Sequence, residues 1–229
     1  MMVFMQGELT SFRDALTASV ERLGIPIDAK QLDLLESHYA AMVRVNESMN
    51  LTRITDPVEA AIKHYADSLA MLPWAEQAGI NQATLLDIGT GAGFPAVPIA
   101  VMRPGWRITA IDGTRKKTNF LSEIAADLKL ENLHVEHGHS DHWTTNEKYD
   151  LVATRAVASL LRSMQLARLF LRKNGRLVAY KTHPMAKDEL QEAIHECGRL
   201  GMELEPCHVY DLELNCEKLT RALYVARCR

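Results

Sequence analysis

The first eighty residues of the chain repeat their apolar positions at helical spacing. One such pattern covers residues 9–23, a second follows Asp28, and a third follows Asp56 and runs to about residue 72. Aspartate is a favoured cap at a helix start, and the proline after Asp56 is tolerated in a first helical turn. The pattern predicts three helices, and we expect residues 1–80 to form a helical extension packed on the rest of the chain.

From residue 81 onward the chain changes to short apolar runs that alternate with helical patterns. The expected strands are residues 84–88, 107–111, 133–136, 151–154 and 176–180, and the expected helices are residues 96–102, 116–128, 160–171 and 186–200. Such alternation indicates a parallel sheet with helices on both faces. The last two runs, residues 203–210 and 219–226, have no helix between them and predict an antiparallel hairpin at one sheet edge. We therefore expect residues 81–229 to form an α/β domain with a mostly parallel, seven-stranded sheet.

Composition is typical of a globular protein. Apolar residues make up 47% of the 229 residues and charged residues 24%, and no apolar run approaches the length needed to cross a bilayer. The start lacks the basic stretch and apolar core of a secretory signal. The cysteines, Cys197, Cys207, Cys216 and Cys228, lie near the end of the chain without paired metal spacing. We interpret them as free thiols of a cytoplasmic protein.

Charge is unevenly distributed along the chain. The formal net charge is −3, which does not indicate a nucleic-acid binder, but the stretch between Asp150 and Asp188 contains no acidic residue. Its basic residues are Arg155, Arg162, Arg168, Arg172, Lys173, Arg176, Lys181 and Lys187. A local basic field can steer a phosphate backbone even on a slightly acidic protein. The alternative is that these charges point in several directions and only solvate the surface.

A glycine-rich segment directly follows the expected strand at residues 84–88. Gly89, Gly91 and Gly93 are spaced two residues apart, Asp87 precedes them, and the next expected strand leads into Asp112. A strand, a glycine turn that a ligand can approach, a helix and an acid at the end of the following strand are the parts of an adenosine site, with the acid on the ribose hydroxyls. An ordinary glycine-rich turn is the alternative.

The spacing of these glycines favours one cofactor over another. In the dinucleotide pattern Gly-x-Gly-x-x-Gly, a pyrophosphate lies on the helix N-terminus. Here the third glycine comes one residue early and Phe94 follows it. This shorter turn suits the uncharged linker of S-adenosylmethionine and argues against a nicotinamide oxidoreductase.

The segments that follow the expected strands resemble one known family, the small-subunit (16S) ribosomal RNA guanine 7-methyltransferases, also called glucose-inhibited division protein B. The resemblance extends from about Asn50 to Lys181. Its pieces are Asn50-Leu51-Thr52, Asp56-Pro57, His64, Asp67-Ser68, the segment from Asp87 to Pro95, Asp112, Lys116-Lys117, Phe120-Leu121 and Arg155-Ala156-Val157-Ala158.

The resemblance implies a class I, Rossmann-like methyltransferase that uses S-adenosylmethionine and releases S-adenosylhomocysteine. It places cofactor contacts at Gly89, Phe94, Ser140, Asp141 and Arg155, and the glycine segment adds Asp87, Thr90, Gly91, Gly93 and Asp112. The expected RNA contacts are Lys116, Lys117, Arg162 and Lys181, with a solvated first helical turn as the alternative for the first two. The implied partner is small-subunit ribosomal RNA or the ribosomal subunit. Separately from the resemblance, we expect a monomer in the cytoplasm.

Methyl transfer to guanine nitrogen 7 needs little from catalytic side chains. The sulfonium is already electrophilic and the ring nitrogen carries no proton, so alignment, worth on the order of 7–11 kcal/mol, replaces general-base catalysis. Arg155 is expected to face the pocket and to reach the methionine carboxylate, the guanine or a phosphate; a structural ion pair with Asp87 or Asp112 is the alternative. His64 and Asp67, three residues apart on one helix face, either orient the base or join the helical segment to the sheet.

Four histidines, at positions 134, 137, 139 and 142, lie close together with Asp141 among them. His134 and His137 have the odd spacing that sends strand side chains to opposite faces, so we expect no native metal. Two other functions remain open: a methyltransferase for a small molecule, and a non-catalytic nucleic-acid-binding protein that retains the fold.

Overall fold

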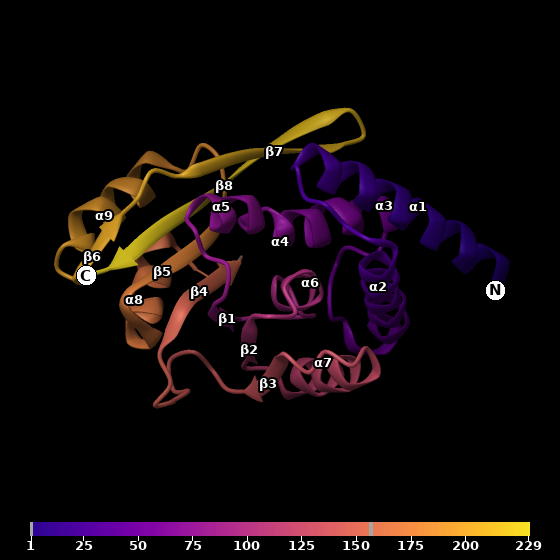
Figure 1. Ribbon diagram of the computed structural model, residues 1–229, viewed down its shortest axis with the longest axis horizontal. Helices are drawn as coiled ribbons and strands as arrows, with labels where there is room; N and C mark the ends of the chain where they lie inside the picture. Colours follow the sequence, from indigo (N-terminus) through magenta and orange to yellow (C-terminus); the bar gives the residue numbers. More distant parts are fainter. Residues whose placement is uncertain (1, 156–157) are drawn as a thin grey trace.

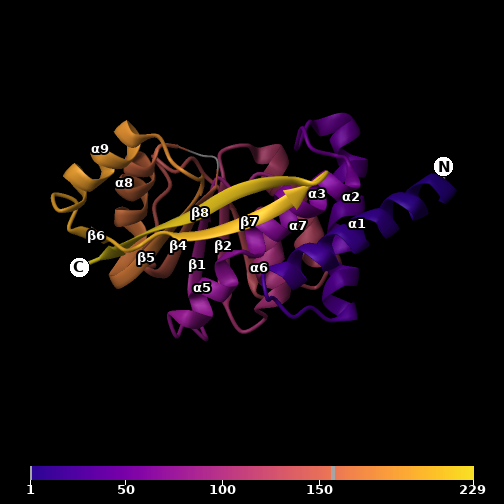
Figure 2. The ribbon, with the colours of Figure 1, turned by 90° about the horizontal axis from the view of Figure 1, so that it is seen from above.

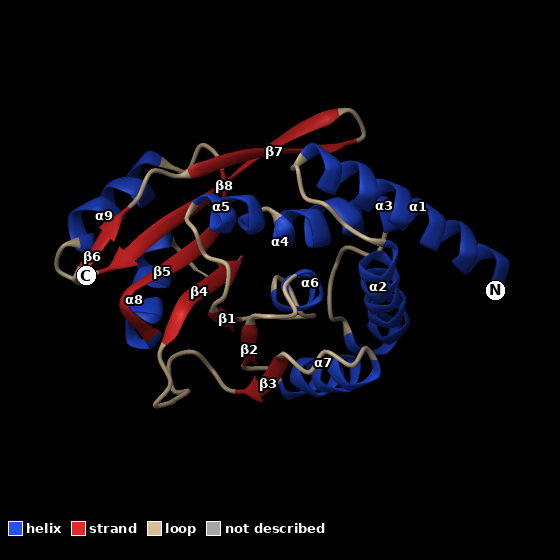
Figure 3. Cartoon of the chain, viewed as in Figure 1, coloured by secondary structure: helices blue, strands red, loops and turns tan. Residues whose placement is uncertain are grey.

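The computed structural model describes residues 2–155 and 158–229 of the chain, a central sheet with helices on both faces (Figures 1 and 3). Five strands are parallel: β1 (Thr84–Ile88), β2 (Arg107–Asp112), β3 (Leu133–His137), β4 (Tyr149–Arg155) and β5 (Leu171–Thr182). The sheet order is β3-β2-β1-β4-β5-β8-β6, with β8 (Glu217–Cys228) antiparallel to β5. The expected parallel sheet is confirmed, and the carboxyl ends of β1, β2 and β4 lie side by side.

The two faces of the sheet bury separate cores because successive side chains of a strand point to opposite faces. Leu85 of β1 packs with α6 (Ala96–Met102), α7 (Arg115–Asp127) and the helices of the first eighty residues. Leu86 packs instead with α8 (Leu160–Phe170) and α9 (Lys187–Cys197). The helical extension and one face of the sheet therefore share a single hydrophobic cluster.

The helices after Asp28 and Asp56 begin where these cap residues predicted, whereas the first helix begins at Met2, before the expected residue 9. The N-terminal helices are α1 (Met2–Arg22), α2 (Ala29–Met49), α3 (Pro57–Ala60), the π-helical turn η1 (Ala61–Ala66), α4 (Asp67–Leu69) and α5 (Met71–Gln77). Asp28 and Gln31 form a reciprocal capping box, and Asp56 accepts a hydrogen bond from the N–H of Glu59. The third expected helix differs from a uniform α-helix, because it widens into a π-turn over Ala61–Ala66. Such turns are frequent at functional sites.

The expected strand at residues 203–210 is wrong as a single element. It is two strands, β6 (Met202–Leu204) and β7 (His208–Leu214), which pair with successive parts of β8. Pro206, which has no N–H to donate, lies between them. Within the described residues the sheet thus has eight strands instead of the expected seven, although β6 and β7 together occupy one position beside β8.

The predicted hairpin is confirmed and is longer than expected. Asn215 and Cys216 connect β7 to β8 with φ of 52° and 64°, the left-handed pair of a two-residue hairpin turn. The hairpin extends beyond the sheet and passes over the N-terminal helices (Figure 2). Arg22 of α1 pairs with Glu213 of β7 at 2.8 Å, and Leu214 and Leu219 pack on the same cluster as α1.

Candidate active site

The turn after β1 is built from glycines in left-handed backbone. The φ angles of Gly89, Gly91 and Gly93 are 75°, 61° and 106°. The Gly89 N–H donates to the carbonyl of Ile111 at 2.9 Å, and the Gly93 N–H donates to the carbonyl of Thr90 at 2.9 Å. The turn is therefore tied to the end of β2 and closed on itself, in a conformation that favours glycine.

These glycines have different physical roles. A Cβ atom on Gly93 would lie 2.7 Å from Val97 Cγ2 and 2.9 Å from Leu121 Cδ1, so this position is packed and admits no side chain. Gly89 and Gly91 remain partly exposed. The backbone at these two positions is therefore accessible from solvent, and contact with a ligand there stays a prediction.

Asp87 lies fully buried beneath the turn. Its Oδ2 accepts a hydrogen bond from the N–H of Ala96 at 3.1 Å. Burial raises the pKa of this carboxyl group to about 7, because the charged form loses its hydration. The hydroxyl of Thr90, in the turn above, offsets part of this rise in pKa by its hydrogen bond to the Asp87 carboxyl group.

Asp112 fastens the turn from the neighbouring strand. One carboxylate oxygen accepts from the N–H of Gly91 at 3.0 Å and the other from the N–H of Thr114 at 2.8 Å. The Lys117 Nζ lies 4.0 Å from Asp112 Oδ2. Each carboxylate oxygen has a second lone pair, so these bonds leave acceptor capacity for a hydroxyl group.

Arg155, the last residue of β4, is clasped by the π-turn. Its Nη1 donates to the carbonyl oxygens of Lys63 at 3.0 Å and His64 at 3.1 Å, and to Asp67 Oδ2 at 3.2 Å. Its Nη2 donates to His64 Nδ1 at 2.8 Å, and its Cζ lies 5.5 Å from the ring centroid of Phe94. The guanidinium therefore links the helical extension to β4 beside the glycine turn.

His64 is held in one neutral tautomer. Arginine can only donate, so His64 Nδ1 accepts from Arg155 and the ring proton is on Nε2, which donates to Thr52 Oγ1 at 2.9 Å. The ring stacks on Phe94 with centroids 4.6 Å apart and an interplanar angle of 19°. Burial and the charge of Arg155 lower the pKa of His64 to about 3. His64 therefore stays uncharged at neutral pH.

Asp67 joins Arg155 to the C-terminal hairpin. The hydroxyl of Tyr210 donates to Asp67 Oδ1 at 2.6 Å, and Arg221 Nε donates to the same oxygen at 3.2 Å. Arg155 and Arg221 thus share one buried carboxylate. Arg155 contacts the side chains of both His64 and Asp67 and so connects these two residues, while their role toward a base stays a prediction.

The sequence analysis gave an ion pair of Arg155 with Asp87 or Asp112 as the structural alternative, and both partners were wrong. The carboxylate partner of Arg155 is Asp67, whereas Asp87 and Asp112 bond to backbone N–H groups of the glycine turn and its surroundings. Arg221 was missed. The register of the predicted hairpin is the signal that could have found it, because Arg221 pairs with Thr182 at the carboxyl end of β5.

His38 of α2 is a second residue that the sequence analysis missed. It is fully buried, its Nε2 donates to the carbonyl of Ala92 at 2.9 Å, and its Nδ1 accepts from the hydroxyl of Tyr65 at 2.7 Å. The carbonyl fixes this tautomer because it can only accept. Burial lowers the pKa of His38 to about 4. No short motif marks it, since its role depends on contact between α2 and a turn more than fifty residues away.

The segment after β3 supplies Ser140 and Asp141. The N–H of Gly138 donates to the carbonyl of Asp112 at 3.1 Å, which places this segment beside the end of β2. Ser140 is half-buried, and Asp141 is exposed and forms an ion pair with Arg162. Arg162 thus already has a carboxylate partner.

The remaining expected RNA contacts, Lys116, Lys117 and Lys181, differ in exposure and in hydrogen bonding. Lys116 is exposed in the first turn of α7, next to the half-buried Lys117. Lys181 Nζ donates to Glu189 Oε1 at 2.8 Å and to the carbonyl of Ala158 at 2.5 Å. Lys181 therefore joins the end of β5 to α9.

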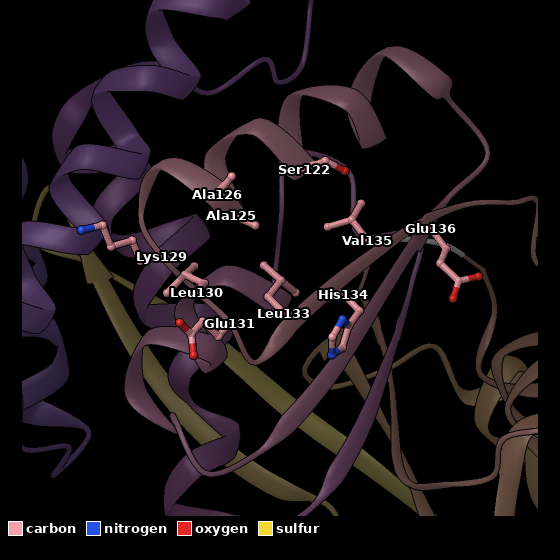
Figure 4. A pocket seen from close by; sticks show the side chains of 10 residues that line it. All are labelled: Ser122, Ala125, Ala126, Lys129, Leu130, Glu131, Leu133, His134, Val135 and Glu136. Carbon is pink, nitrogen blue, oxygen red and sulfur yellow. The ribbon is translucent and has the colours of Figure 1, made fainter.

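A cavity of about 630 Å³ lies apart from these residues, between α7 and the edge strand β3 (Figure 4). Lys129, Glu131, His134 and Glu136 lie along it, and none of the expected site residues does. Among the residues that the structure describes, no group of three or more histidine, cysteine or acidic side chains is placed to hold a metal ion. No described helix is long and apolar enough to cross a membrane.

The glycine turn and its acid fit S-adenosylmethionine. The backbone is partly exposed at Gly89 and Gly91, and Asp112 retains acceptor capacity at the end of β2. This turn, in a sheet of order β3-β2-β1-β4-β5-β8-β6, defines a class I, Rossmann-like methyltransferase that depends on S-adenosylmethionine. The chain matches the rRNA small subunit methyltransferase G (GidB) family over residues 31–218, and it belongs to that family.

Relatives and solved structures agree with this assignment. A ribosomal RNA small subunit methyltransferase G from Solibacter usitatus is 38% identical over 200 residues, which cover 87% of this chain and 86% of the relative. One from Bacillus subtilis is 33% identical over 218 residues, 93% of this chain and 89% of the relative. The fold is similar to precorrin-6Y C5,15-methyltransferase from Geobacter metallireducens, with a TM-score of 0.50 and 15% identity over 64% of this chain and 80% of that one. It is also similar to M. jannaschii TYW2 in complex with AdoMet, with a TM-score of 0.51 and 16% identity over 64% and 68%.

Proposed function

We propose that this chain transfers the methyl group of S-adenosylmethionine to ring nitrogen 7 of one guanine in small-subunit (16S) ribosomal RNA. Family membership supports the RNA substrate. The observation that carries the reaction is the state of His64 beside the glycine turn. Both of its ring nitrogens are engaged and its pKa is lowered to about 3, so it is unsuited to accept a proton from a substrate. Guanine nitrogen 7 has no proton to remove.

The protein's contribution to this reaction is alignment. Bound S-adenosylmethionine supplies an electrophilic methyl group at the glycine turn. The cofactor would be held by the backbone of Gly89 and Gly91. The residues around that backbone that would also contact the cofactor are Thr90, Gly93, Phe94, Asp87, Asp112, Ser140 and Asp141. Phe94 stacks on His64 and lies beside the guanidinium of Arg155, so the three groups form a preorganised wall next to the turn. Good alignment of donor and acceptor is worth on the order of 7–11 kcal/mol.

In this proposal Arg155, His64 and Asp67 position groups and do not exchange protons. Asp67 holds the guanidinium of Arg155, and Arg155 in turn fixes the ring of His64. Lys116 and Lys117 face solvent to different degrees near the end of β2 and would meet the phosphate backbone. Arg162 and Lys181 would contribute by ordering the segments that flank the pocket.

We propose further that the protein acts as a monomer in the cytoplasm, with residues 1–80 as a helical extension and residues 81–229 as the methyltransferase domain. The shared hydrophobic cluster supports a firm junction between the two parts. Light scattering after size-exclusion chromatography tests the monomer, since a dimer would give twice the mass of 25.7 kDa.

Mass spectrometry of ribosomal RNA tests the proposed function. Small-subunit RNA from cells that lack the gene should lose one methyl group from one guanine, and the purified protein should restore it with labelled S-adenosylmethionine. A full complement of methyl groups in the deletion strain would contradict the proposal. Salt dependence separates RNA from a small neutral substrate, because binding of RNA falls steeply with ionic strength. Binding of RNA without transfer of label would identify the non-catalytic alternative.

A further inference from the structure

A second cavity lies next to Arg155 on the side of the C-terminal hairpin. Its volume is about 500 Å³, and it is bounded by the π-turn and α4, by the end of β5 and by the β7–β8 hairpin. In Figure 1 the β7–β8 ribbon passes over this part of the molecule. The cavity shares Arg155 and Asp67 with the active site, and 500 Å³ lies within the range of small-molecule and cofactor sites.

The lining of this cavity carries excess positive charge. The basic side chains are Lys63, Arg155, Lys218 and Arg221, with His183 beside them, and the acidic one is Asp67. Asp67 is 3% exposed and is shared by two guanidinium groups, which leaves one positive charge without a carboxylate partner. Arg155 and Arg221 are only 13% and 26% exposed. A positive charge with so little access to water is stabilised by an incoming anion.

The two lysines can exchange their present partners for such an anion. Lys63 pairs with Glu59 at 2.6 Å and Lys218 pairs with Asp211 at 2.9 Å, and neither acid lines the cavity. The lysine side chains are 37% and 68% exposed. Ion pairs this exposed contribute little net energy, so they do not hold the ammonium groups away from a phosphate.

From this arrangement we infer that the cavity binds a backbone phosphate of the substrate RNA next to the target guanine, an inference that rests on the proposed function. Lys63, Lys218 and Arg221 are the contact residues. The lining is cationic and, apart from His183, offers no ring on which a base could stack, so the cavity suits a phosphate better than the guanine itself. Because Arg155 also faces Phe94, a nucleotide held here lies beside the methyl-transfer site.

The test replaces charge without disturbing the core. Lys63→Gln, Lys218→Gln and the double variant are compared with Lys173→Gln, a matched exposed lysine at the opposite end of β5 from the cavity. Affinity for in vitro transcribed small-subunit RNA is measured over a range of KCl concentrations, together with the KM for RNA. Melting temperature and the Kd for S-adenosylmethionine verify that each variant is folded.

We expect each cavity variant to lower the steepness of the salt dependence by about 0.7–0.9 in log Kobs against log salt, because one phosphate contact is lost. The double variant should raise the KM for RNA about tenfold while the Kd for S-adenosylmethionine and the kcat stay unchanged. Lys173→Gln should match the wild type. A salt dependence and KM for RNA that do not change in the double variant would contradict the inference.

Two further results would contradict different statements, one the assignment of RNA to the cavity and the other the proposed function. Calorimetry with inorganic phosphate tests a site for a free anion, and a weaker phosphate affinity in the double variant without any change in RNA binding would overturn the RNA assignment. If the wild type transferred no methyl group to RNA, the proposed function would fail. The binding measurements need no turnover, so they would still decide whether the cavity contacts RNA.

Discussion

The Nε2 atom of His38 lies 2.9 Å from the carbonyl oxygen of Ala92, inside the glycine turn. This contact fastens the turn to α2, while the hydroxyl of Tyr65 fixes the other side of the same ring. The N-terminal helices therefore help to hold the turn that we propose binds the cofactor, and they do more than cover it. The contact joins residues that lie 54 positions apart in the sequence.

We expect His38→Phe to weaken binding of S-adenosylmethionine by roughly tenfold. Phenylalanine preserves an aromatic ring but removes both hydrogen bonds, leaving a buried carbonyl and a buried hydroxyl unpaired at a cost of about 1–3 kcal/mol each. Calorimetry gives the Kd and urea denaturation gives the free energy of unfolding. Ser37→Ala, the exposed neighbour on α2, is the control. A loss of stability with an unchanged Kd would mean that His38 serves the core alone.

Much of the fold follows from local patterns in the sequence. The apolar runs predicted the five parallel strands, and Asp28 and Asp56 predicted the starts of their helices, because caps and strand alternation depend on neighbouring residues. The break between β6 and β7 was missed, although Pro206 stands there, because both halves pair with the same long strand. The π-turn was also missed. Two of its carbonyl oxygens accept hydrogen bonds from Arg155, which belongs to the distant strand β4, so no local pattern marks the turn.

The candidate site was predictable to a similar degree. The glycine turn and Asp112 could be placed because the carboxyl ends of adjacent parallel strands meet at one edge. The partners of Arg155 could not, because Asp67 and Arg221 come together only through tertiary packing of the helical extension against the hairpin. Residue spacing alone does not determine such contacts.

Asp87 should make the stability of the protein depend on pH. Its pKa is raised from 3.8 to about 7, so the folded state binds a proton that the unfolded state releases between these values. The stabilisation is fully present below pH 3.8 and is lost as the pH rises through about 7, at roughly 1.4 kcal/mol per pH unit. Asp87→Asn stays neutral. Urea denaturation between pH 4 and pH 7 should show the wild type losing stability relative to this variant, and parallel curves would contradict the buried, protonated carboxyl group.

Lys181 should matter for stability and Lys116 for RNA. Lys181→Met breaks contacts with Glu189 and the carbonyl of Ala158, and we expect a loss of about 1 kcal/mol in the free energy of unfolding with little change in RNA affinity. Lys116 is exposed, so Lys116→Gln should leave the melting temperature unchanged and weaken RNA binding more at low salt than at high salt. Thermal unfolding and RNA binding of both variants check the contrast. The reverse pattern would show that Lys181 reaches the RNA.

Removal of Arg155 should affect both activity and stability. Arg155→Ala leaves the buried carboxylate of Asp67 with Arg221 as its remaining cationic partner, and it frees the carbonyl oxygens of Lys63 and His64. Breaking a buried ion pair from one side costs about 3–5 kcal/mol, which for a chain of this size lowers the melting temperature by roughly 6–20 °C. Turnover should fall further than stability explains, because His64 loses the donor that fixes its ring beside Phe94.

Arg155→Lys separates the two effects: it keeps the charge near Asp67 but cannot span the π-turn and His64 together. We expect it to recover part of the melting temperature and little of the single-turnover rate, measured at saturating S-adenosylmethionine. If Arg155→Lys restored the rate in full, the charge alone would be sufficient and the fork-shaped contact would have no role in alignment.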